Sequence, residues 1–230
     1  MPTHREIYLD HAPEYEQLVA REDYEGNILR ALQRIVPLSN LRVIDLGAGT
    51  GRLACLVAPF VKSVIALDAS VPMLRIAAGK LRTSGLKEWL AAAAEHRALP
   101  LAMGDANLIV SGWSASYVAS WNPEIWREAA EEWYAEARRV LRVDGLIILF
   151  ESLGTGNESP QRLPHVENFY DWLDEKGFSS DWIRTDYRFE SSETADRLTG
   201  FFFGEEMKQY IKRGESVTLP ECTGIWWKHL

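Results

Sequence analysis

The sequence is poor in cysteine and histidine, the residues that build disulfide frameworks and zinc sites. Its two cysteines, Cys55 and Cys222, lie far apart and form no C-x-x-C pair, which is typical of reduced, packed cysteines. The five histidines show no metal-ligand spacing. We therefore expect neither a disulfide nor a bound metal.

Long hydrophobic runs and excess positive charge are also absent. No apolar stretch approaches the roughly 20 residues that span a bilayer, and the opening MPTHREIYLDH is too polar for a signal peptide. The formal net charge is −8, which disfavours the diffuse basic surface that non-specific binding to nucleic acids or anionic membranes requires. We expect a cytoplasmic protein, either a monomer or a homodimer, that has neither a membrane nor a nucleic acid as its partner.

What the chain does contain is a regular alternation of short apolar runs and longer segments of helical period. This pattern is typical of βαβ units in a parallel sheet, and it predicts an α/β three-layer sandwich. Ser70 is placed to cap one of the helices, and Pro123 lies in the first turn of another. The strand-like runs are LRVIDL, SVIALD, EWLAAAAE, NLIVSGW and GLIILFES.

We expect a single domain over residues 1–230, since no repeat, low-complexity tract or linker interrupts it. DWIRTDYRFE is expected to form one strand and CTGIWWKH the last strand, while ESLGTGNESPQRLP is expected to form a loop. The parts of the domain are an N-terminal helical cap (1–40), a core (41–152) and a rim region (153–230) with a helical insert (191–220).

Three glycines follow the first strand at alternate positions in RVIDLGAGTGRL: Gly47, Gly49 and Gly51. Glycine at a strand-to-helix turn lets a ligand approach the backbone, and a helix beginning near Gly51 aims free amide groups at the same point. The loop therefore predicts a cofactor cradle. It fits neither G-x-G-x-x-G nor a P-loop, because Arg52 follows Gly51 and no Gly-Lys-Ser/Thr comes after. A turn that only packs a helix on the sheet is the alternative.

Asp68 ends the second strand, in VIALDAS. A carboxylate at this place can accept hydrogen bonds from both hydroxyls of a ribose that lies across the strand ends. Capping the next helix would be the simpler role, but Ser70 is available for it. Together with the glycine loop, Asp68 indicates a nucleoside-containing cofactor.

With these residues, VIDLGAGTGRL followed by ALDASVPMLRIA resembles the first two motifs of the class I S-adenosylmethionine-dependent methyltransferases. The likeness extends through EHRALPL, ANLIVSGWS and ARRVLRVDGLIILFE, over about residues 40–152. The resemblance implies a Rossmann-like seven-stranded, mostly parallel sheet with an antiparallel last strand, N-terminal helices, and an insert between strands six and seven. It also implies S-adenosyl-L-methionine as the cofactor and S-adenosyl-L-homocysteine as the product.

Family positions carried over to this sequence suggest roles for individual residues. Asp45 and the loop would hold the methionine part, and Asp68 the ribose. Glu95, with His96 beside it, would lie near the adenine amine, and Asp105 is the alternative for this acid. The full expected cofactor set is Asp45, Gly47, Ala48, Gly49, Gly51, Asp68, Ala69, Met73, Glu95, His96, Ser111 and Trp113.

The resemblance suggests direct in-line transfer of a methyl group to a small-molecule acceptor. This transfer needs alignment and water exclusion rather than a metal or a covalent nucleophile. Weak candidates for a base are His11, Tyr15, Glu151 and His165. The alternatives are a non-catalytic S-adenosylmethionine-binding protein and a nicotinamide-dependent oxidoreductase.

Aromatic residues divide into core and site candidates. Trp126 and Trp133 repeat on one helical face and are expected in the core, whereas Trp113 and Trp121 are expected to border an acceptor. We expect at least two of the phenylalanines in GFFFG to be core residues. The insert and the N-terminal helices are expected to form a lid over the acceptor. Arg184, Thr185, Arg188 and Glu221 are expected mainly in surface ion pairing.

Overall fold

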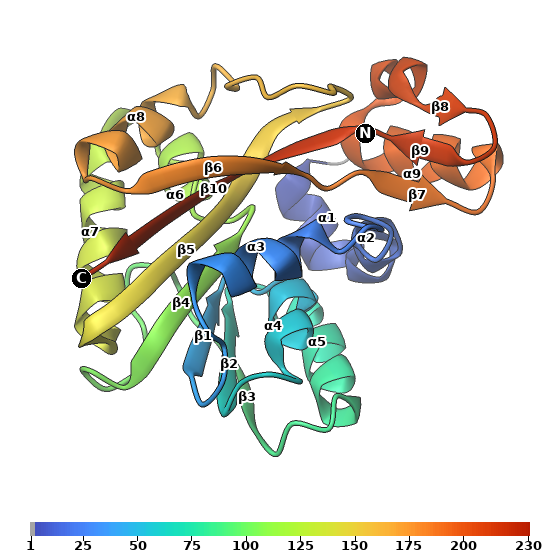
Figure 1. Cartoon of the computed structure of the whole chain (residues 1–230). Helices are drawn as coiled ribbons and strands as arrows, with labels where there is room; N and C mark the ends of the chain where they lie inside the picture. The colour runs from blue at the N-terminus through green and yellow to red at the C-terminus, as the bar shows by residue number, and fades with distance from the viewer. Residues whose placement is uncertain (1–2) are drawn as a thin grey trace.

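A seven-stranded sheet forms the centre of the molecule. The structure is a computed structural model that describes residues 3–230. The strands lie side by side in the order β3-β2-β1-β4-β5-β10-β6 (Figure 1). Their bounds are β1 Arg42–Leu46, β2 Ser63–Asp68, β3 Glu88–Ala93, β4 Ala106–Gly112, β5 Leu141–Thr155, β6 Ser179–Arg184 and β10 Glu221–His229.

Strand direction decides which edge of this sheet can receive a ligand. Strands β1 to β5 run parallel to one another, and β10 runs antiparallel to both of its neighbours. The carboxyl ends of β1 to β5 therefore meet at one edge, where the glycine loop leaves β1. The predicted mostly parallel sheet with an antiparallel last strand is confirmed. β5 is longer than expected, because Glu151–Thr155, which we expected in a loop, continues to pair with β10.

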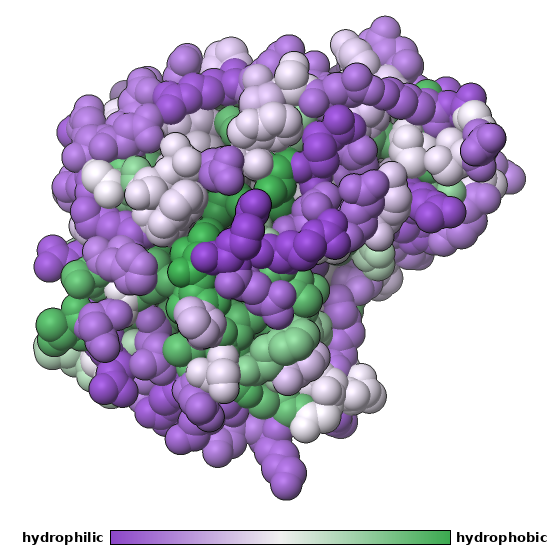
Figure 2. Space-filling view, in the orientation of Figure 1, coloured by the Kyte–Doolittle hydropathy of each residue, from purple (hydrophilic) through white to green (hydrophobic). Residues whose placement is uncertain are grey.

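One face of the sheet is covered by α3 (Asn27–Ile35), α4 (Arg52–Val57) and α5 (Val71–Thr83). Ile28 and Leu32 of α3 pack with Val57 of α4 and Leu81 of α5 on alternate residues of the strands. Figure 2 shows hydrophobic residues gathered in the middle of this side of the molecule, with hydrophilic residues around them. Ser70 caps α5 as predicted, with its hydroxyl accepting from the backbone N–H of Met73 at 3.4 Å.

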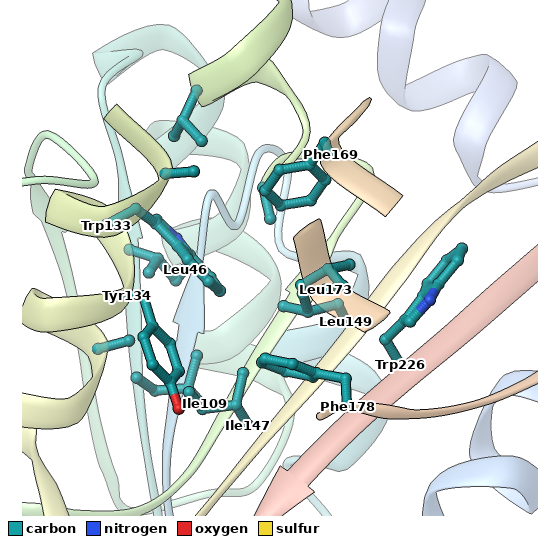
Figure 3. Packing of buried hydrophobic residues seen from close by; sticks show 14 of the residues in the cluster. Leu46, Ile109, Trp133, Tyr134, Ile147, Leu149, Phe169, Leu173, Phe178 and Trp226 are labelled. Carbon is teal, nitrogen blue, oxygen red and sulfur yellow. The ribbon is translucent and has the colours of Figure 1, made fainter. Parts of the chain in front are cut away.

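The other face packs against α7 (Trp126–Val140) and α8 (Glu167–Glu175); α6 (Tyr117–Ser120) and the short η1 (Pro123–Ile125) precede α7. Figure 3 shows Trp133 and Tyr134 of α7 lying near Phe169 and Leu173 of α8, with Ile147 below them. Trp133 is fully buried, and Trp126 is partly buried against the same cluster. Both tryptophans thus pack in the core, as the helical spacing predicted.

Two short N-terminal helices lie at the carboxyl edge of the sheet. They are α1 (His4–Asp10) and α2 (Ala12–Val19), within the helical cap expected over residues 1–40, and Thr3 and Glu6 form a complete capping box at the start of α1. α1 contacts α5, and α2 contacts both α5 and the insert. α3 behaves differently, because it packs on the sheet face instead of roofing the glycine loop.

The insert between β6 and β10 contains the expected helices and also a second sheet. The expected single strand over DWIRTDYRFE breaks after Arg184, where the chain leaves the main sheet. In Figure 1 the insert lies beside the N-terminal helices, and Leu18 of α2 is buried in its small core. Its elements are β7 (Tyr187–Phe189), α9 (Ser192–Phe203), η2 (Glu205–Tyr210), β8 (Lys212–Arg213) and β9 (Val217–Leu219), with the sheet order β7-β9-β8.

Candidate functional site

The glycine loop turns sharply from β1 into α4. Gly47, Gly49 and Gly51 all have positive φ, at 75°, 53° and 81°, a conformation that other residues rarely adopt. Gly51 also has no room for a side chain, since a Cβ would come within 2.9 Å of the Cβ of Ala77. A Cβ on Gly49 would meet only Tyr15, at 3.8 Å. The loop thus presents bare backbone toward Tyr15.

Two carboxylates brace this loop. Asp45 is buried in β1, and its Oδ2 accepts from the backbone N–H of Ala54 at 2.8 Å. Burial raises the pKa of Asp45 to about 7. Asp68 accepts from the N–H of Gly49 at 2.8 Å and from that of Ser70 at 2.7 Å. Burial raises the pKa of Asp68 against these two hydrogen bonds. The acid at the end of β2 therefore connects the glycine loop to the start of α5.

A cavity of about 500 Å³ opens at the carboxyl edge of the sheet, bounded by the glycine loop, the N-terminal helices, α6 and the insert. It is lined by His4, Tyr8, Tyr15, Leu18, Val19 and Glu22 from the N-terminal region; Asp45, Gly47, Ala48, Gly49, Thr50, Arg52 and Leu53 around the loop; Gly112, Trp113, Ser116, Tyr117, Ser120 and Trp121 after β4; Glu151, Ser152, Thr155, Leu163, His165, Val166 and Tyr170 from β5 to α8; and Tyr187, Phe202, Phe203 and Glu221 from the insert and β10.

The structure brings part of the expected cofactor set to this cavity: Asp45, Gly47, Ala48, Gly49 and Trp113. The remaining expected residues do not line it, and most of them lie toward β2, β3 and α5. Helix α1 lies over this β2, β3 and α5 end of the site, where the Ser70 hydroxyl donates to the carbonyl oxygen of Tyr8 at 2.6 Å. The residues outside the lining are Gly51, Asp68, Ala69, Met73, Glu95, His96 and Ser111.

Strand direction shows which of the two candidate acids, Glu95 or Asp105, lies at the carboxyl edge of the sheet. Glu95 is exposed just after β3, at the carboxyl edge. Asp105 precedes β4 and pairs with Arg42 at 2.9 Å, at the amino ends of the strands. It therefore lies at the edge opposite Gly47. His96 contacts the Ser114 hydroxyl at 3.1 Å, and burial lowers the pKa of His96 to about 4.

Three of the four base candidates line the cavity: Tyr15, Glu151 and His165. His11 does not; it lies between α1 and α2, against Phe201. Glu151 has both oxygens occupied, since Ser116 donates its N–H at 2.9 Å and its hydroxyl at 2.8 Å. Burial raises the pKa of Glu151 to about 7 and that of Tyr15 far above its usual range.

Sequence reasoning missed a buried ion pair beside the loop. Arg52 at the start of α4 pairs with Glu22, and Glu22 also accepts from the Tyr187 hydroxyl at 2.8 Å. The Arg52 guanidinium stacks on Trp113 at 3.5 Å from the ring centre. Trp113 itself has an unusual φ of 52°, which is a strained backbone conformation often found at functional sites. The position of Arg52 directly after the glycine loop was the available signal.

Two residues expected in surface ion pairing are buried instead. Thr185 is 0% exposed and Glu221 is 2% exposed, because the chain crosses from β6 into the insert at Thr185 and returns through Glu221. Thr185 contacts the Thr223 hydroxyl at 2.6 Å. Arg184 does make the expected ion pair, with Asp186 at 2.7 Å. Arg188 is exposed and lies over the ring of Tyr24.

Aromatic side chains form the wall opposite the loop. Tyr117 and Trp121 of this wall stack with ring centres 4.6 Å apart, and the hydroxyls of Tyr8 and Tyr117 lie 2.7 Å apart. Phe202 and Phe203, expected in the core, pack against the small core of the insert and also line the cavity. The wall therefore draws residues from both ends of the chain.

Within residues 3–230, no group of three or more His, Cys, Asp or Glu side chains is placed to hold a metal ion. No helix of this part of the chain combines the length and apolar character that crossing a bilayer requires.

The fold matches that of several solved structures. The YcgJ protein from Bacillus subtilis is 14% identical with a TM-score of 0.61, covering 89% of this chain and 98% of its own. An S-adenosylmethionine-dependent methyltransferase from Aquifex aeolicus is 14% identical with a TM-score of 0.54, covering 98% of this chain and 93% of its own. A structure described as the [4+2]-cyclase SpnF is 18% identical with a TM-score of 0.57, covering 90% of this chain and 80% of its own.

The sheet order and the glycine loop define a Rossmann-like methyltransferase fold. Residues 44–149 match the family model described as "Methyltransferase domain". The match to this family model and the shared fold thus confirm the resemblance seen in the sequence. No curated protein matches the sequence. Since a cyclase shares the fold, the fold alone does not give the reaction.

Proposed function

We propose that the protein transfers the methyl group of S-adenosylmethionine to a small-molecule acceptor and releases S-adenosylhomocysteine. The cavity carries this proposal, because the glycine loop bounds one side of it and an aromatic wall the other. Beside the loop, Thr50 Oγ1 and Arg52 Nη2 are buried without a hydrogen-bond partner among the described residues. Buried polar atoms are normally paired, so these two suit a polar ligand.

The residues present fit the cofactor. The unpartnered donors on Thr50 and Arg52 suit a carboxylate, and the buried Asp45 beside them suits an ammonium group, so this end matches the methionine part. Asp68 would hold the ribose hydroxyls. When bound, the cofactor supplies a methyl group that is already activated on a sulfonium.

The chain itself would align the acceptor and exclude water. Helices α1 and α2 and the insert close the cavity on the side away from the sheet. Tyr15 is a poor base, because burial raises its pKa far above the usual range, and Glu151 is held by Ser116. Of the four sequence candidates, His165 is left as the base for a hydroxyl acceptor.

Calorimetric titration with S-adenosylmethionine and S-adenosylhomocysteine tests the proposal, with NAD and NADP as controls. We expect micromolar binding of the first pair alone, followed by formation of S-adenosylhomocysteine with a suitable acceptor. Binding of NAD or NADP alone would instead support an oxidoreductase. Cofactor binding without turnover over a broad acceptor panel would support a binding protein that lacks transfer.

A further inference from the structure

Acidic side chains outnumber Arg and Lys side chains in the lining of the cavity. Four carboxylates line it, Glu22, Asp45, Glu151 and Glu221, whereas Arg52 is its one Arg or Lys among the described residues. Arg52 is already paired with Glu22 and lies over the ring of Trp113. The charge of this arginine is thus balanced by Glu22, and its Nη2, unpaired within residues 3–230, is assigned above to the cofactor, so the acidic groups remain in excess.

Three of the four carboxylates have identifiable partners within the fold. Asp45 accepts from the backbone of Ala54, Glu151 accepts from Ser116, and Glu22 accepts from Arg52, Tyr187 and Thr185. These contacts brace α4, the start of α6 and the insert, respectively. Each of these three carboxylates therefore has a partner within the fold, and Asp45 is also the one assigned above to the ammonium group of the cofactor.

Glu221 is different. Its Oε1 accepts from the Ser152 hydroxyl at 2.6 Å, but its Oε2 has no hydrogen-bond partner within residues 3–230. The side chain is fully buried at the start of β10 and lines the cavity. A buried carboxylate oxygen without a partner loses the hydration it had in the unfolded chain. Such an atom suits a ligand that supplies a hydrogen-bond donor or a cation.

The surrounding walls suit a cation as well as an apolar group. Trp113, Tyr117, Trp121 and Tyr170 line the same cavity as Glu221, and aromatic ring faces attract ammonium groups. Tyr187 and Phe203 add ring surface from the insert. A cavity that combines excess carboxylate with many aromatic rings is poorly suited to an anionic acceptor, because no uncompensated cation would meet its charge.

We propose that the methyl acceptor is an amine-bearing, partly apolar small molecule whose ammonium group binds the carboxylate of Glu221. This inference rests on the proposed function and names its substrate class. The ammonium gives its proton to Glu221, which here acts in place of His165. The freed nitrogen lone pair then forms the N–C bond to the methyl group, while the electron pair of the broken S–C bond stays on sulfur.

Binding of matched probes to the protein saturated with S-adenosylhomocysteine tests this. The probes are 2-phenylethylamine and trimethyl(2-phenylethyl)ammonium, which are cations, and 3-phenylpropionate, which has a similar ring and the opposite charge. We expect the wild-type protein to bind both cations at least about tenfold more tightly than the anion. Equal or tighter binding of the anion, or no binding of either cation, would overturn the proposal.

Variants separate the role of Glu221 from other roles. Glu221→Gln keeps the shape but removes the charge, and we expect at least about a tenfold loss of cation affinity with unchanged affinity for S-adenosylhomocysteine. Glu221→Asp should keep the preference for cations. Glu215→Gln, which changes an exposed acid of the insert shortly before β10, is the matched control and should change nothing. Thermal melting of each variant verifies folding.

Each outcome has a distinct meaning. If Glu221→Gln retains cation affinity, the carboxylate does not bind the acceptor and the proposal fails. If it loses affinity for S-adenosylhomocysteine, Glu221 holds the cofactor, and the proposal fails in that way. If the wild-type protein does not bind S-adenosylhomocysteine at all, it is the proposed function that fails.

Discussion

At the residue scale, Asp68 has two roles, and one substitution removes both. Its oxygens accept from Gly49 and Ser70, and its position at the end of β2 suits a ribose. Asp68→Ala should lower cofactor affinity by about tenfold to a hundredfold. It should also cost about 1–2 kcal/mol of unfolding free energy, because two backbone N–H groups lose their acceptor.

Calorimetry and thermal melting measure the two effects of Asp68→Ala separately. Glu95→Gln, which changes an exposed acid just after the next strand, provides the control and should preserve stability. Unchanged affinity in Asp68→Ala would move the ribose contact to another residue.

The buried ion pair between Arg52 and Glu22 leads to a second prediction at the scale of residues. The Glu22 side chain is 3% exposed and that of Arg52 18%, so removing the arginine leaves a buried carboxylate without its cation. Arg52→Met should destabilise the fold by about 3 kcal/mol, and the double variant with Glu22→Gln should recover part of this. Denaturant unfolding measures both.

A matched control for this pair lies on the surface, between Arg127 and Glu175, whose side chains are 54% and 55% exposed. Arg127→Met should cost at most about 1 kcal/mol. Equal losses in Arg52→Met and Arg127→Met would show that the buried pair has no special importance.

At the scale of elements, α1 covers the end of the site that contains Asp68. It is held there by the contacts of Tyr8 with Ser70 and Tyr117. Removing residues 1–10 should therefore speed dissociation of S-adenosylhomocysteine by about tenfold or more and reduce methyl transfer, because water enters the cavity. Stopped-flow dissociation and a turnover assay measure these effects.

A point variant guards against a simple loss of folding. Tyr8→Phe removes one hydroxyl that bonds to Tyr117, and it should give a smaller change in the same direction. Tyr24→Phe, on an exposed ring, should change neither rate. If dissociation and turnover stay at wild-type values without α1, this helix is not a lid.

The elements differ in how far the sequence predicts them. Apolar runs predicted the main sheet, because its central strands β1, β4 and β5 each have several buried residues in a row. β7 has only three residues and β8 two, too few for a periodic signal, so the second sheet was not predicted. α1 has seven residues and one buried position, Ile7. Its capping box was the one local sign of a helix.

At the scale of the whole molecule, the sequence predicts the position of some site residues and not of others. Asp45, Gly47 and Gly49 come from one local motif, and the sequence placed them at the edge where the cavity lies. Glu22 and Glu221 meet this motif only after folding, because they come from opposite ends of the chain. No local pattern in the sequence connects these two carboxylates, so their burial was not predicted.

The buried carboxylates should make the stability of the whole protein fall as the pH rises from about 4 to about 8. Burial raises the pKa of Asp45 and of Glu151 to about 7, and that of Glu221, which also faces Glu22, to about 8. In the unfolded chain the same groups ionise near pH 4, so the folded state binds more protons between these values. Unfolding free energy is therefore highest below the unfolded pKa and is lost as pH rises through the folded pKa.

Buried histidines make the unfolding free energy rise with pH, opposite to the carboxylates, but only at lower pH. The pKa of His96 and that of His4 are lowered by burial, so their effect is complete once the unfolded histidines are neutral, above about pH 7. Between pH 7 and 8 Glu221 should dominate, lowering the unfolding free energy by at most about 1.4 kcal/mol per pH unit, because Asp45 and Glu151 are already largely ionised there.

Urea unfolding of the wild type and Glu221→Gln from pH 6 to pH 9 measures this dependence. The Glu221 carboxyl faces Glu22 just after α2, Arg52 at the start of α4, and Ser152 and Thr155 in β5. The positive charge of Arg52 only partly offsets the rise in the pKa of Glu221 that burial causes. Glu221→Gln should therefore flatten the decline and be the more stable protein near pH 9. Parallel curves would mean that Glu221 ionises as easily in the folded protein as in the unfolded chain, which its burial beside Glu22 argues against.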